Sequence, residues 1–476
     1  MISRREILRT LGAIPLAGAA GALTPGRLYA EAATKLPKRL LGRTGRMVVP
    51  LGLGGQGSLQ FTAPGIDAPD IIVRAVQLGL NYLDCANRYG SSQINYGEAF
   101  RRLHLAPSDP SYNRALRESL YITSKTRVRH AADPARPGPT AIDQLERSLT
   151  QMFGDGKGFI PEGAYLDVMQ IHHLMSFEEV DQIYVGYDDR GTGKRDQVGV
   201  MAAMVDYRDG TNSTGLNPEH KRWIRHIGIT GHQSSPVLMS AIRRDRDGVI
   251  DTLLVALNSN DRLCSSHQNN VLPLAVARGI GVIAMKIFGD GTYYGKPSRF
   301  SNSPDDVIRT VGKPGAVAYS DLVRYPLSLP GVSVEIIGTG HIDREKPEND
   351  QLVANLAAAV TDLPSEIERL RIEKESKDRH GAATNYFQEM TNILVQPGQV
   401  TTKRDGDRVT VEWNTAFAGP QPLRSYNIVA GNRVLLSLPF RPQCTEQPLS
   451  ASLEAAVIGN DTVRVVASEE PPRQVA

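Results

Sequence analysis

Four polar residues stand at or just after the ends of short apolar segments in the first half of the chain. Asp84 and Tyr89 lie in "YLDCANRYG", Lys125 ends "LYITSK" and His172 lies in "YLDVMQIHH". A carboxylate, a phenol, an ammonium group and an imidazole can together protonate an oxygen that gains negative charge, as carbonyl reduction requires. Taken singly, each residue also has a structural explanation, such as a capped loop, a packed ring or a surface charge. Their shared position at strand ends favours the catalytic interpretation.

The phenol is the natural proton donor of this set, although it is a weak acid with an unperturbed pKa of about 10. An ammonium group ~4 Å away would stabilise the phenolate by on the order of 4 kcal/mol at an effective dielectric of ~20. We therefore expect Lys125 to acidify Tyr89, and Asp84 to hold Lys125 charged and oriented. His172 is expected to hydrogen-bond the substrate oxygen. The adjacent His173 is predicted to point to the opposite side of its strand and to be structural.

The fold must bring these distant residues together. From about residue 40 the chain alternates short β-branched segments with amphipathic ones, and eight strand candidates, each followed by a helix-like segment, cover residues from "MVVPLGLG" to "VSVEIIGTG". This alternation predicts an α/β fold, specifically a (β/α)₈ TIM barrel with insertions, in which the strand ends converge on one pocket. A doubly wound open sheet is the alternative.

The stretch "VVPLGLGGQGS" (residues 48–58) matches the G-x-G-x-x-G dinucleotide fingerprint. In a Rossmann unit a helix follows these glycines directly. Here "SLQFTAPGIDAPD" follows, with two prolines and no apolar repeat at helical spacing. We therefore interpret the stretch as the first barrel strand, with glycines that relieve crowding where the chain leaves the barrel mouth.

Composition narrows the class of function. The net charge of +3 over 476 residues, without a Lys/Arg run interleaved with aromatics, argues against a nucleic-acid partner. The three cysteines (Cys85, Cys264 and Cys444) form no C-x-x-C pair, so neither a metal site nor a disulfide framework is predicted. The sequence also contains no H-E-x-x-H or G-x-S-x-G motif.

Residues 1–32 are predicted to be a targeting segment. "SRREIL" with paired Arg4 and Arg5 precedes the apolar run "TLGAIPLAGAAGALTP" and an A-x-A at residues 30–32. This order resembles a twin-arginine signal peptide, which exports folded proteins. We expect a periplasmic or secreted protein without stable membrane insertion after cleavage. A frayed N-terminal helix is the alternative. Capture of a cofactor before export would explain the use of this route.

The remainder of the chain is predicted to form two domains, a barrel over residues 38–394 and a small all-β sandwich over residues 395–476. Strand-like alternation in "GDRVTVEWNTAFAGPQPLRSYNIVAGNRVLLSLP" looks like a fibronectin type III-like module, with Trp413 and Tyr426 in its core. Between the domains, "SEIERLRIEKESKDRHG" is predicted to be a charged helix on the outside of the barrel.

A family resemblance accompanies these motifs. "LGRTGRMVVPLGLGG", "LGLNYLDCANRYG", "YITSK", "YLDVMQIHH", "HIGITGH" and "GIGVIAMKIFGDG" resemble, in this order, the blocks of the aldo-keto reductases over about residues 40–360. The resemblance implies a catalytic tetrad of Asp84, Tyr89, Lys125 and His172. It also implies a TIM barrel, a nicotinamide cofactor (NADP or NAD) bound in extended form, and a small-molecule carbonyl or alcohol substrate.

The resemblance also implies a set of cofactor ligands: Gly54, Thr230, Gly231, His232, Asn260, Lys286, Gly289, Gly291, Gly338, Gln351 and Asn355. In "GITGH" Thr230 takes the place of the family's serine and Gly231 that of its asparagine, a loss for which His232 is expected to compensate. The long segments after His172 and Lys286 are predicted to shape the substrate pocket. Tyr293 and Tyr294 in the second are predicted to clamp the dinucleotide.

Two rival interpretations stay open at this point. A non-catalytic exported binding protein could reuse the barrel scaffold, and the altered cofactor blocks favour it. Alternatively, an enzyme could keep its nicotinamide bound and recycle it within one turnover cycle.

Overall fold

The computed structural model describes most of the chain after the predicted targeting segment. The described residues are 36–61, 65–190, 196–264, 266–297, 303, 306–307, 317–381, 388, 392–459 and 461–472. The predicted signal peptide, residues 1–32, lies outside them. No helix within the described residues is long and apolar enough to cross a membrane.

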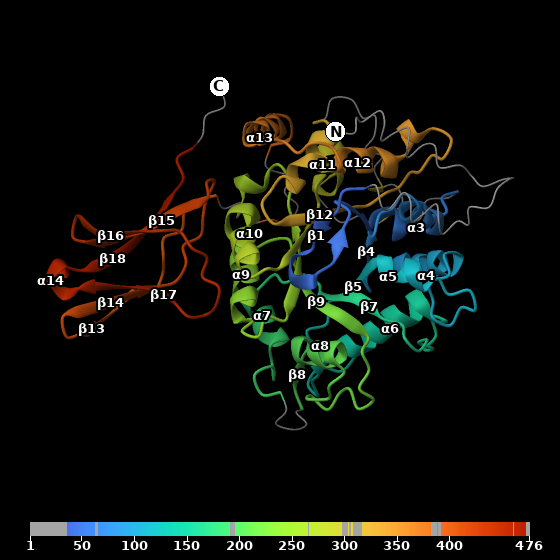
Figure 1. Cartoon of the computed structure of the whole chain (residues 1–476), viewed down its shortest axis with the longest axis horizontal. Helices are drawn as coiled ribbons and strands as arrows, with labels where there is room; N and C mark the ends of the chain where they lie inside the picture. The colour runs from blue at the N-terminus through green and yellow to red at the C-terminus, as the bar shows by residue number, and fades with distance from the viewer. Residues whose placement is uncertain are drawn as a thin grey trace.

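Eight parallel strands form a closed barrel (Figure 1). In spatial order they are β3 (Leu51–Gly54), β4 (Tyr82–Asp84), β5 (Tyr121–Thr126), β7 (Leu166–Ile171), β9 (Ile224–Gly231), β10 (Ile250–Ala256), β11 (Gly281–Met285) and β12 (Val332–Ile337). The last strand pairs with the first, Glu335 opposite Leu51, which closes the sheet. The predicted TIM barrel is confirmed, and the open doubly wound sheet is wrong.

Helices surround the barrel. They are α3 (Ala68–Gln77), α4 (Ser92–Arg102), α5 (Arg114–Ser119), α6 (Ala141–Phe153), α7 (Phe177–Ile183), α8 (Val200–Asp209), α9 (Ser235–Arg244), α10 (His267–Ala277), α11 (Tyr319–Leu327), α12 (Gln351–Ala359) and α13 (Glu366–His380). Helix α6 shows why such segments are helical. Thr140 and Asp143 form a capping box at its start, and Leu145 and Leu149 face the core. The charged helix α13 packs against α11, as predicted.

Shorter elements complete the domain. Strands β1 (Arg39–Leu40) and β2 (Met47–Val48) form a hairpin, and β6 (His130–Ala132) pairs with β8 (Val198–Gly199). The single-turn 3₁₀ segments are η1 (Gly42–Thr44), η2 (Gly57–Leu59), η3 (Asp261–Leu263) and η6 (Pro347–Asn349). A longer segment, η4 (Gly289–Tyr294), is kinked at Asp290 and Gly291. Leu41 and Val48, on either side of the β1–β2 turn, pack with Tyr82 and Tyr121 in one buried apolar cluster. Polar residues are thereby left to the opposite, carboxyl end of the strands.

The glycine-rich stretch belongs to the barrel wall. A Cβ on Gly52 would lie 2.8 Å from the Tyr82 carbonyl oxygen, and one on Gly55 would lie 2.5 Å from that of Asp84. Both distances are too short for a side chain, so the close approach of β3 to β4 requires glycine. The short η2 turn, and not a Rossmann helix, follows these glycines. The fingerprint match is therefore a consequence of strand crowding at the barrel mouth.

The C-terminal part is a small all-β domain, visible on the left of Figure 1. One sheet contains β13 (Thr401–Asp405), β14 (Arg408–Trp413) and β17 (Leu449–Glu454), and the other contains β16 (Arg433–Pro439), β15 (Leu423–Ala430) and β18 (Val463–Glu469). A four-residue helix, α14 (Ala455–Ile458), follows β17. Trp413 and Tyr426, the predicted core aromatics, pack together with ring centroids 5.7 Å apart.

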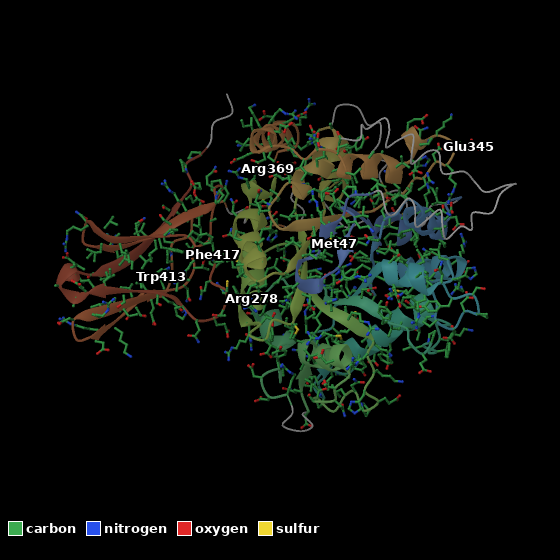
Figure 2. All side chains as sticks on the ribbon, in the orientation of Figure 1. Met47, Arg278, Glu345, Arg369, Trp413 and Phe417 are labelled. Atoms are coloured by element: carbon green, nitrogen blue, oxygen red, sulfur yellow. The ribbon has the colours of Figure 1, made fainter. Side chains whose placement is uncertain are left out.

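This domain is attached to the side of the barrel through α10. The Asn270 side chain both accepts from the Ala418 amide (2.7 Å) and donates to the Ala418 carbonyl (3.0 Å). Phe417 packs against the barrel core, and Arg278 donates to the Cys444 carbonyl at 2.8 Å. Figure 2 shows Phe417 and Arg278 at this junction. Hydrogen bonds from barrel side chains to the backbone of the C-terminal domain, together with the apolar Phe417 side chain, thus hold the two domains together.

One buried carboxyl group in the barrel wall is poorly accommodated. Glu335 of β12 is fully buried on the outer, helix-facing side of the barrel, and neither carboxyl oxygen has a hydrogen-bond partner among the described residues. Its strand neighbours Leu51 and Ala284 belong to the apolar outer layer. Burial raises the pKa of Glu335 well above 4.5, and Arg39 opposes this shift. The folded protein therefore retains a proton here that the unfolded chain releases.

This difference in proton binding predicts a pH-dependent stability. Because the folded state binds the extra proton, the contribution of Glu335 to the free energy of unfolding falls as pH rises above 4.5. We expect Glu335→Gln to raise the unfolding temperature by a few degrees at pH 8 and to change it little at pH 4. Thermal unfolding followed by circular dichroism over this pH range measures the effect. The exposed Glu162→Gln is the control, and equal shifts at both pH values would contradict the assignment.

Candidate active site

The four predicted catalytic residues converge at the carboxyl end of the barrel strands. Lys125 of β5 donates a hydrogen bond to Asp84 Oδ2 and another, of 2.7 Å, to the Cys85 carbonyl oxygen. Its ammonium nitrogen lies 4.9 Å from the centroid of the Tyr89 ring, over the ring face. The Tyr89 hydroxyl lies 3.5 Å from His172 Nε2. Residues that are 88 positions apart in the sequence therefore form one contiguous group.

Burial differs across the group in a way that matters for proton transfer. Asp84 and Lys125 are each 1% exposed, whereas Tyr89 is only partly buried. Burial raises the pKa of Asp84, and Lys125 together with the Thr123 hydroxyl lowers it, with a net upward direction. Burial and the charge of Lys125 hold the pKa of His172 well below 6.5. His172 is therefore a neutral imidazole at pH 7, able to hydrogen-bond an oxygen without carrying charge.

Two supporting residues were missed in the sequence. The Thr123 hydroxyl donates to Asp84 Oδ1 at 2.9 Å, and Gln170 Nε2 approaches the same oxygen at 3.4 Å. Both are fully buried and come from the inward-facing positions of β5 and β7. Thr123 could have been found as a polar residue two positions before Lys125 in the same strand, since alternate strand residues face the same side, and Gln170 as a polar residue near the end of β7. They keep the buried carboxylate hydrogen-bonded.

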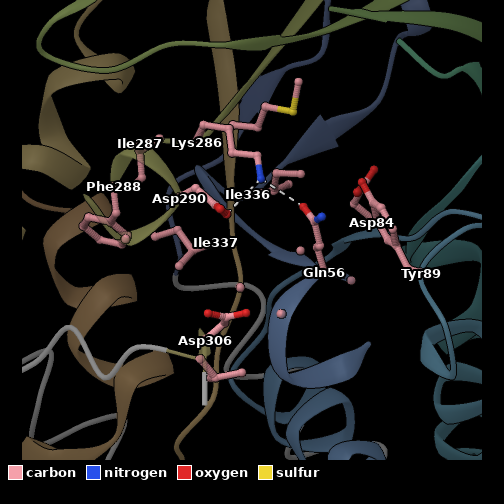
Figure 3. Close-up of a pocket in the computed structure, with 17 residues that line it drawn as sticks. Gln56, Asp84, Tyr89, Lys286, Ile287, Phe288, Asp290, Asp306, Ile336 and Ile337 are labelled. Carbon is pink, nitrogen blue, oxygen red and sulfur yellow. Dashed lines mark hydrogen bonds and ion pairs between the residues drawn. The ribbon is translucent and has the colours of Figure 1, made fainter. Parts of the chain in front are cut away.

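A cleft opens beside Tyr89 at the barrel mouth (Figure 3). Its lining includes the predicted Gly54, Lys286, Gly291 and Gly338, together with Asp84 and Tyr89. Gly289 immediately precedes the lining residue Asp290. The cleft therefore joins the catalytic group to the loops after β3, β11 and β12, where the resemblance predicted the dinucleotide.

A lysine and an aspartate oppose each other in this cleft. Lys286 donates to Gln56 Oε1 at 2.9 Å and to Asp290 Oδ1 at 3.1 Å (Figure 3). Lys296 pairs with the other Asp290 oxygen. Lys286 has a left-handed backbone, with φ of 58°, which is uncommon for a residue other than glycine. Such strained positions concentrate at functional sites. Gln56 and Asp290 were overlooked although both lie in motifs that predicted other ligands.

Two predicted cofactor ligands are used inside the protein. A Cβ on Gly231 would lie 2.6 Å from a Leu238 methyl group, so this glycine allows α9 to pack closely on β9. The Asn260 side chain donates to the Gly381 carbonyl and has no position in the cleft lining. Thr230, in contrast, is fully buried on the inward side of β9, and its hydroxyl has no partner among the described residues. Neither Thr230 nor Asn260 is among the residues that line the cleft.

The prediction that His173 points away from His172 is wrong. The His173 ring centroid lies 5.1 Å from that of His172 and 4.9 Å from that of His232. Strand β7 ends at Ile171, so the alternation of side-chain direction does not extend to these two residues. Burial lowers the pKa of His173 to about 4, with Arg127 and Arg129 adding to the effect. Three neutral imidazoles therefore lie side by side at the mouth.

The residues predicted for the adenosine end lie in α12. Gln351 Oε1 accepts from the amides of Gly340 and His341 at 3.0 and 2.9 Å, so it holds the loop after β12. Asn355 is 1% exposed, and its Oδ1 has no hydrogen-bond partner in the described part of the chain. Gln351 is thus used to hold the loop, whereas no described residue binds the Asn355 oxygen.

The predicted tyrosine clamp is not formed by Tyr293. This ring is buried, and its hydroxyl lies 2.8 Å from Ser259 Oγ and 3.4 Å from Asn258 Oδ1. Tyr294 is also buried and packs edge-on against Phe288 of the cleft lining. Both tyrosines therefore support the loop from behind. Much of the rest of this segment, residues 298–302 and 308–316, lies outside the described residues.

Solved structures with a similar fold include an aldo-keto reductase from Klebsiella pneumoniae in complex with NADPH. It is 17% identical, covers 71% of this chain and 95% of its own, and superposes with a TM-score of 0.44. A second structure, an aldo/keto reductase from the same organism with NADP and acetate, is also 17% identical. It also covers 71% of this chain and 95% of its own, with a TM-score of 0.42. None of the curated proteins matches the sequence significantly.

The sequence profile of the Aldo/keto reductase family matches residues 50–344, which is more than half of the chain. This range contains all eight barrel strands and all four residues of the catalytic group. The chain belongs to the aldo/keto reductase family.

Proposed function

We propose that this protein is an oxidoreductase that interconverts a small carbonyl compound and an alcohol, with NADP(H) or NAD(H) as the hydride carrier. One observation carries the proposal. An ammonium group anchored by Asp84 lies 4.9 Å from the Tyr89 ring, and the hydroxyl of that ring lies 3.5 Å from a neutral histidine. This is the arrangement that protonation of a reduced carbonyl oxygen needs.

The residues of the chain supply the proton chemistry. His172 hydrogen-bonds the carbonyl oxygen and orients it, and Tyr89 gives the oxygen its proton as the carbonyl carbon is reduced. Lys125 stabilises the phenolate that remains on Tyr89, because a positive charge in a dry site interacts strongly with a negative one. Asp84 holds Lys125 in place. In the direction of alcohol oxidation, the same phenolate accepts the hydroxyl proton.

The cleft fits a nicotinamide dinucleotide. When bound, the reduced nicotinamide supplies the hydride. Lys286 would hold the pyrophosphate, because it lines the cleft together with Gly54 and Gly338. Thr230 would contact the nicotinamide end and Asn355 the adenosine; both lie outside the cleft lining, and each has a buried oxygen atom without a partner among the described residues. The glycines at 54, 291 and 338 leave room for the ligand.

One feature favours the rival of a binding protein without turnover. Gly231 and Asn260, two of the expected nicotinamide ligands, serve the packing of the protein itself. The complete catalytic group argues against this rival, because a binding protein has no use for a buried lysine directed at a phenol. Calorimetry with NADPH and turnover of an aldehyde separate the two functions.

We expect Tyr89→Phe to lower the turnover of a neutral aldehyde such as 4-nitrobenzaldehyde by ~100-fold or more, because the proton donor is lost. The Kd for NADPH should stay within about twofold of the unmodified protein, since the ring remains. Oxidation of NADPH, followed by absorbance, gives the rate, and calorimetry gives the Kd. Tyr187→Phe is the matched control. The Tyr187 hydroxyl donates to Asp247 at 3.1 Å, and neither residue lines the cleft. Unchanged turnover in Tyr89→Phe would remove this residue from the mechanism.

The opposed charges in the cleft predict two opposite effects on cofactor affinity. The Asp290 carboxylate competes with a pyrophosphate for Lys286, so Asp290→Asn should tighten NADPH binding by about fivefold, and Lys286→Met should weaken it by about tenfold or more. Calorimetric titration of each variant measures both changes. The exposed Asp188→Asn should leave the Kd unchanged. Equal affinities in all these proteins would place the pyrophosphate elsewhere.

We further propose that the protein is exported in the folded state. The support is the order of paired arginines, an apolar run and an A-x-A site in residues 1–32. Expressed in a Gram-negative host, the full chain should be recovered in the periplasm, and replacement of Arg4 and Arg5 by lysine should leave it in the cytoplasm. Immunoblots of the two fractions test this expectation. Equal export of both proteins would contradict it.

A further inference from the structure

Two arginines at the barrel mouth are unexplained by the proposed reaction. Arg88 directly precedes Tyr89, and Arg127 follows β5 two residues after Lys125. Neither guanidinium group makes a hydrogen bond or an ion pair with any residue that the structure describes. Arg88 is exposed and Arg127 is half-buried. Burying part of a cation without a directly paired counter-charge is costly, which suggests that a partner arrives from outside.

Backbone hydrogen bonds tie both arginines to the catalytic group. The Asn87 amide, one residue before Arg88, donates to the Lys125 carbonyl at 3.2 Å. The carbonyl of Thr126, one residue before Arg127, accepts from the His172 amide at 2.7 Å. The backbone that carries each arginine is therefore held at the same end of the barrel as Tyr89 and His172, the residues proposed to face the reacting oxygen.

Electrostatic effects agree with this placement. Burial lowers the pKa of Arg127, the positive charge of Arg88 lowers it further, and Glu179 opposes both. Arg127 is also the charged group that most lowers the pKa of His173, and it contributes to the shift at His172. Arg88 and Arg127 are thus close enough to repel each other beside the histidines.

The other cations around the site have partners. Lys125 is bound to Asp84, and Lys286 and Lys296 share Asp290. Arg129 donates to the carbonyl oxygens of His172 and His173, and it forms an ion pair with Glu179 at 3.0 Å. The second oxygen of Glu179 accepts from the Met175 amide at 2.7 Å, so each oxygen of this carboxylate already has a hydrogen-bond partner other than Arg127.

We propose that Arg88 and Arg127 form an anion subsite, and that the substrate is a carbonyl compound bearing a carboxylate or a phosphate. This inference rests on the proposed function and names its substrate class. The guanidinium groups would bind the anionic group by charge-assisted hydrogen bonds while the carbonyl oxygen lies between Tyr89 and His172. Because the subsite lies beside the catalytic group and outside the lining of the cofactor cleft, substrate and dinucleotide occupy different parts of the mouth.

Three matched aldehydes test the proposal: 4-formylbenzoate, 4-formylphenyl phosphate and the neutral methyl 4-formylbenzoate. We expect kcat/KM for at least one anionic aldehyde to exceed that for the ester by about tenfold or more. Arg127→Gln and Arg88→Gln should each remove most of this preference and leave the rate with the ester within about twofold. Whichever anionic probe shows the larger preference identifies the oxyanion.

Arg101→Gln is the control. Arg101 is exposed near the carboxyl end of α4 and forms an ion pair with Glu98 at 2.8 Å. Calorimetry of each aldehyde with the NADP⁺-loaded protein measures binding without turnover, so the subsite is tested independently of catalysis. Equal binding of the ester and both anions, or unchanged anion binding in Arg88→Gln and Arg127→Gln, would overturn the subsite. Arginine-dependent anion binding without turnover of any aldehyde would support the subsite and overturn the proposed reaction.

Discussion

The buried ion pair between Lys125 and Asp84 is the interaction on which the rest of the site depends. Both groups are 1% exposed, and removing two charges from water costs several kcal/mol per ion unless close geometry and further hydrogen bonds repay it. Hydrogen bonds from Thr123 and Gln170 to the carboxylate, and from the ammonium group to the Cys85 carbonyl, offset this cost. Four strand or loop residues, Asp84, Cys85, Thr123 and Gln170, therefore hold one cation beside the Tyr89 ring.

The need to hold this buried ion pair explains how polar residues are distributed in the barrel. The interior around Tyr82 and Tyr121 is an apolar cluster, whereas the carboxyl ends of the strands carry an ion pair, three neutral imidazoles and a lysine paired with an aspartate. Almost every charge there is matched within the protein. The unmatched Arg88 and Arg127 stand out for this reason, since an unpaired cation beside low-pKa histidines raises the positive potential where a substrate enters.

The C-terminal domain is joined to the barrel at a distance from this chemistry. Its main contacts are to α10, through Asn270 and Ala418, and to Arg262, which donates to the Pro420 carbonyl at 2.7 Å. Directional backbone contacts of this kind hold the domain in one orientation. Helix α13 connects the outer layer to the loop behind the cleft. Its Ser376 hydroxyl lies 2.6 Å from Ser259 Oγ.

The sequence alone determined the barrel and the convergence of the four residues that it predicted to be catalytic, because strand periodicity is local and the strand ends of a parallel barrel must meet at one mouth. Tertiary packing decided what spacing cannot express. Gly231 faces Leu238 and not the cleft, and His173 joins its neighbour because β7 has already ended. Asp290 neutralises the lysine predicted for the pyrophosphate. The proximity of Arg88 to Arg127 likewise depends on how two loops from different strands approach each other in space.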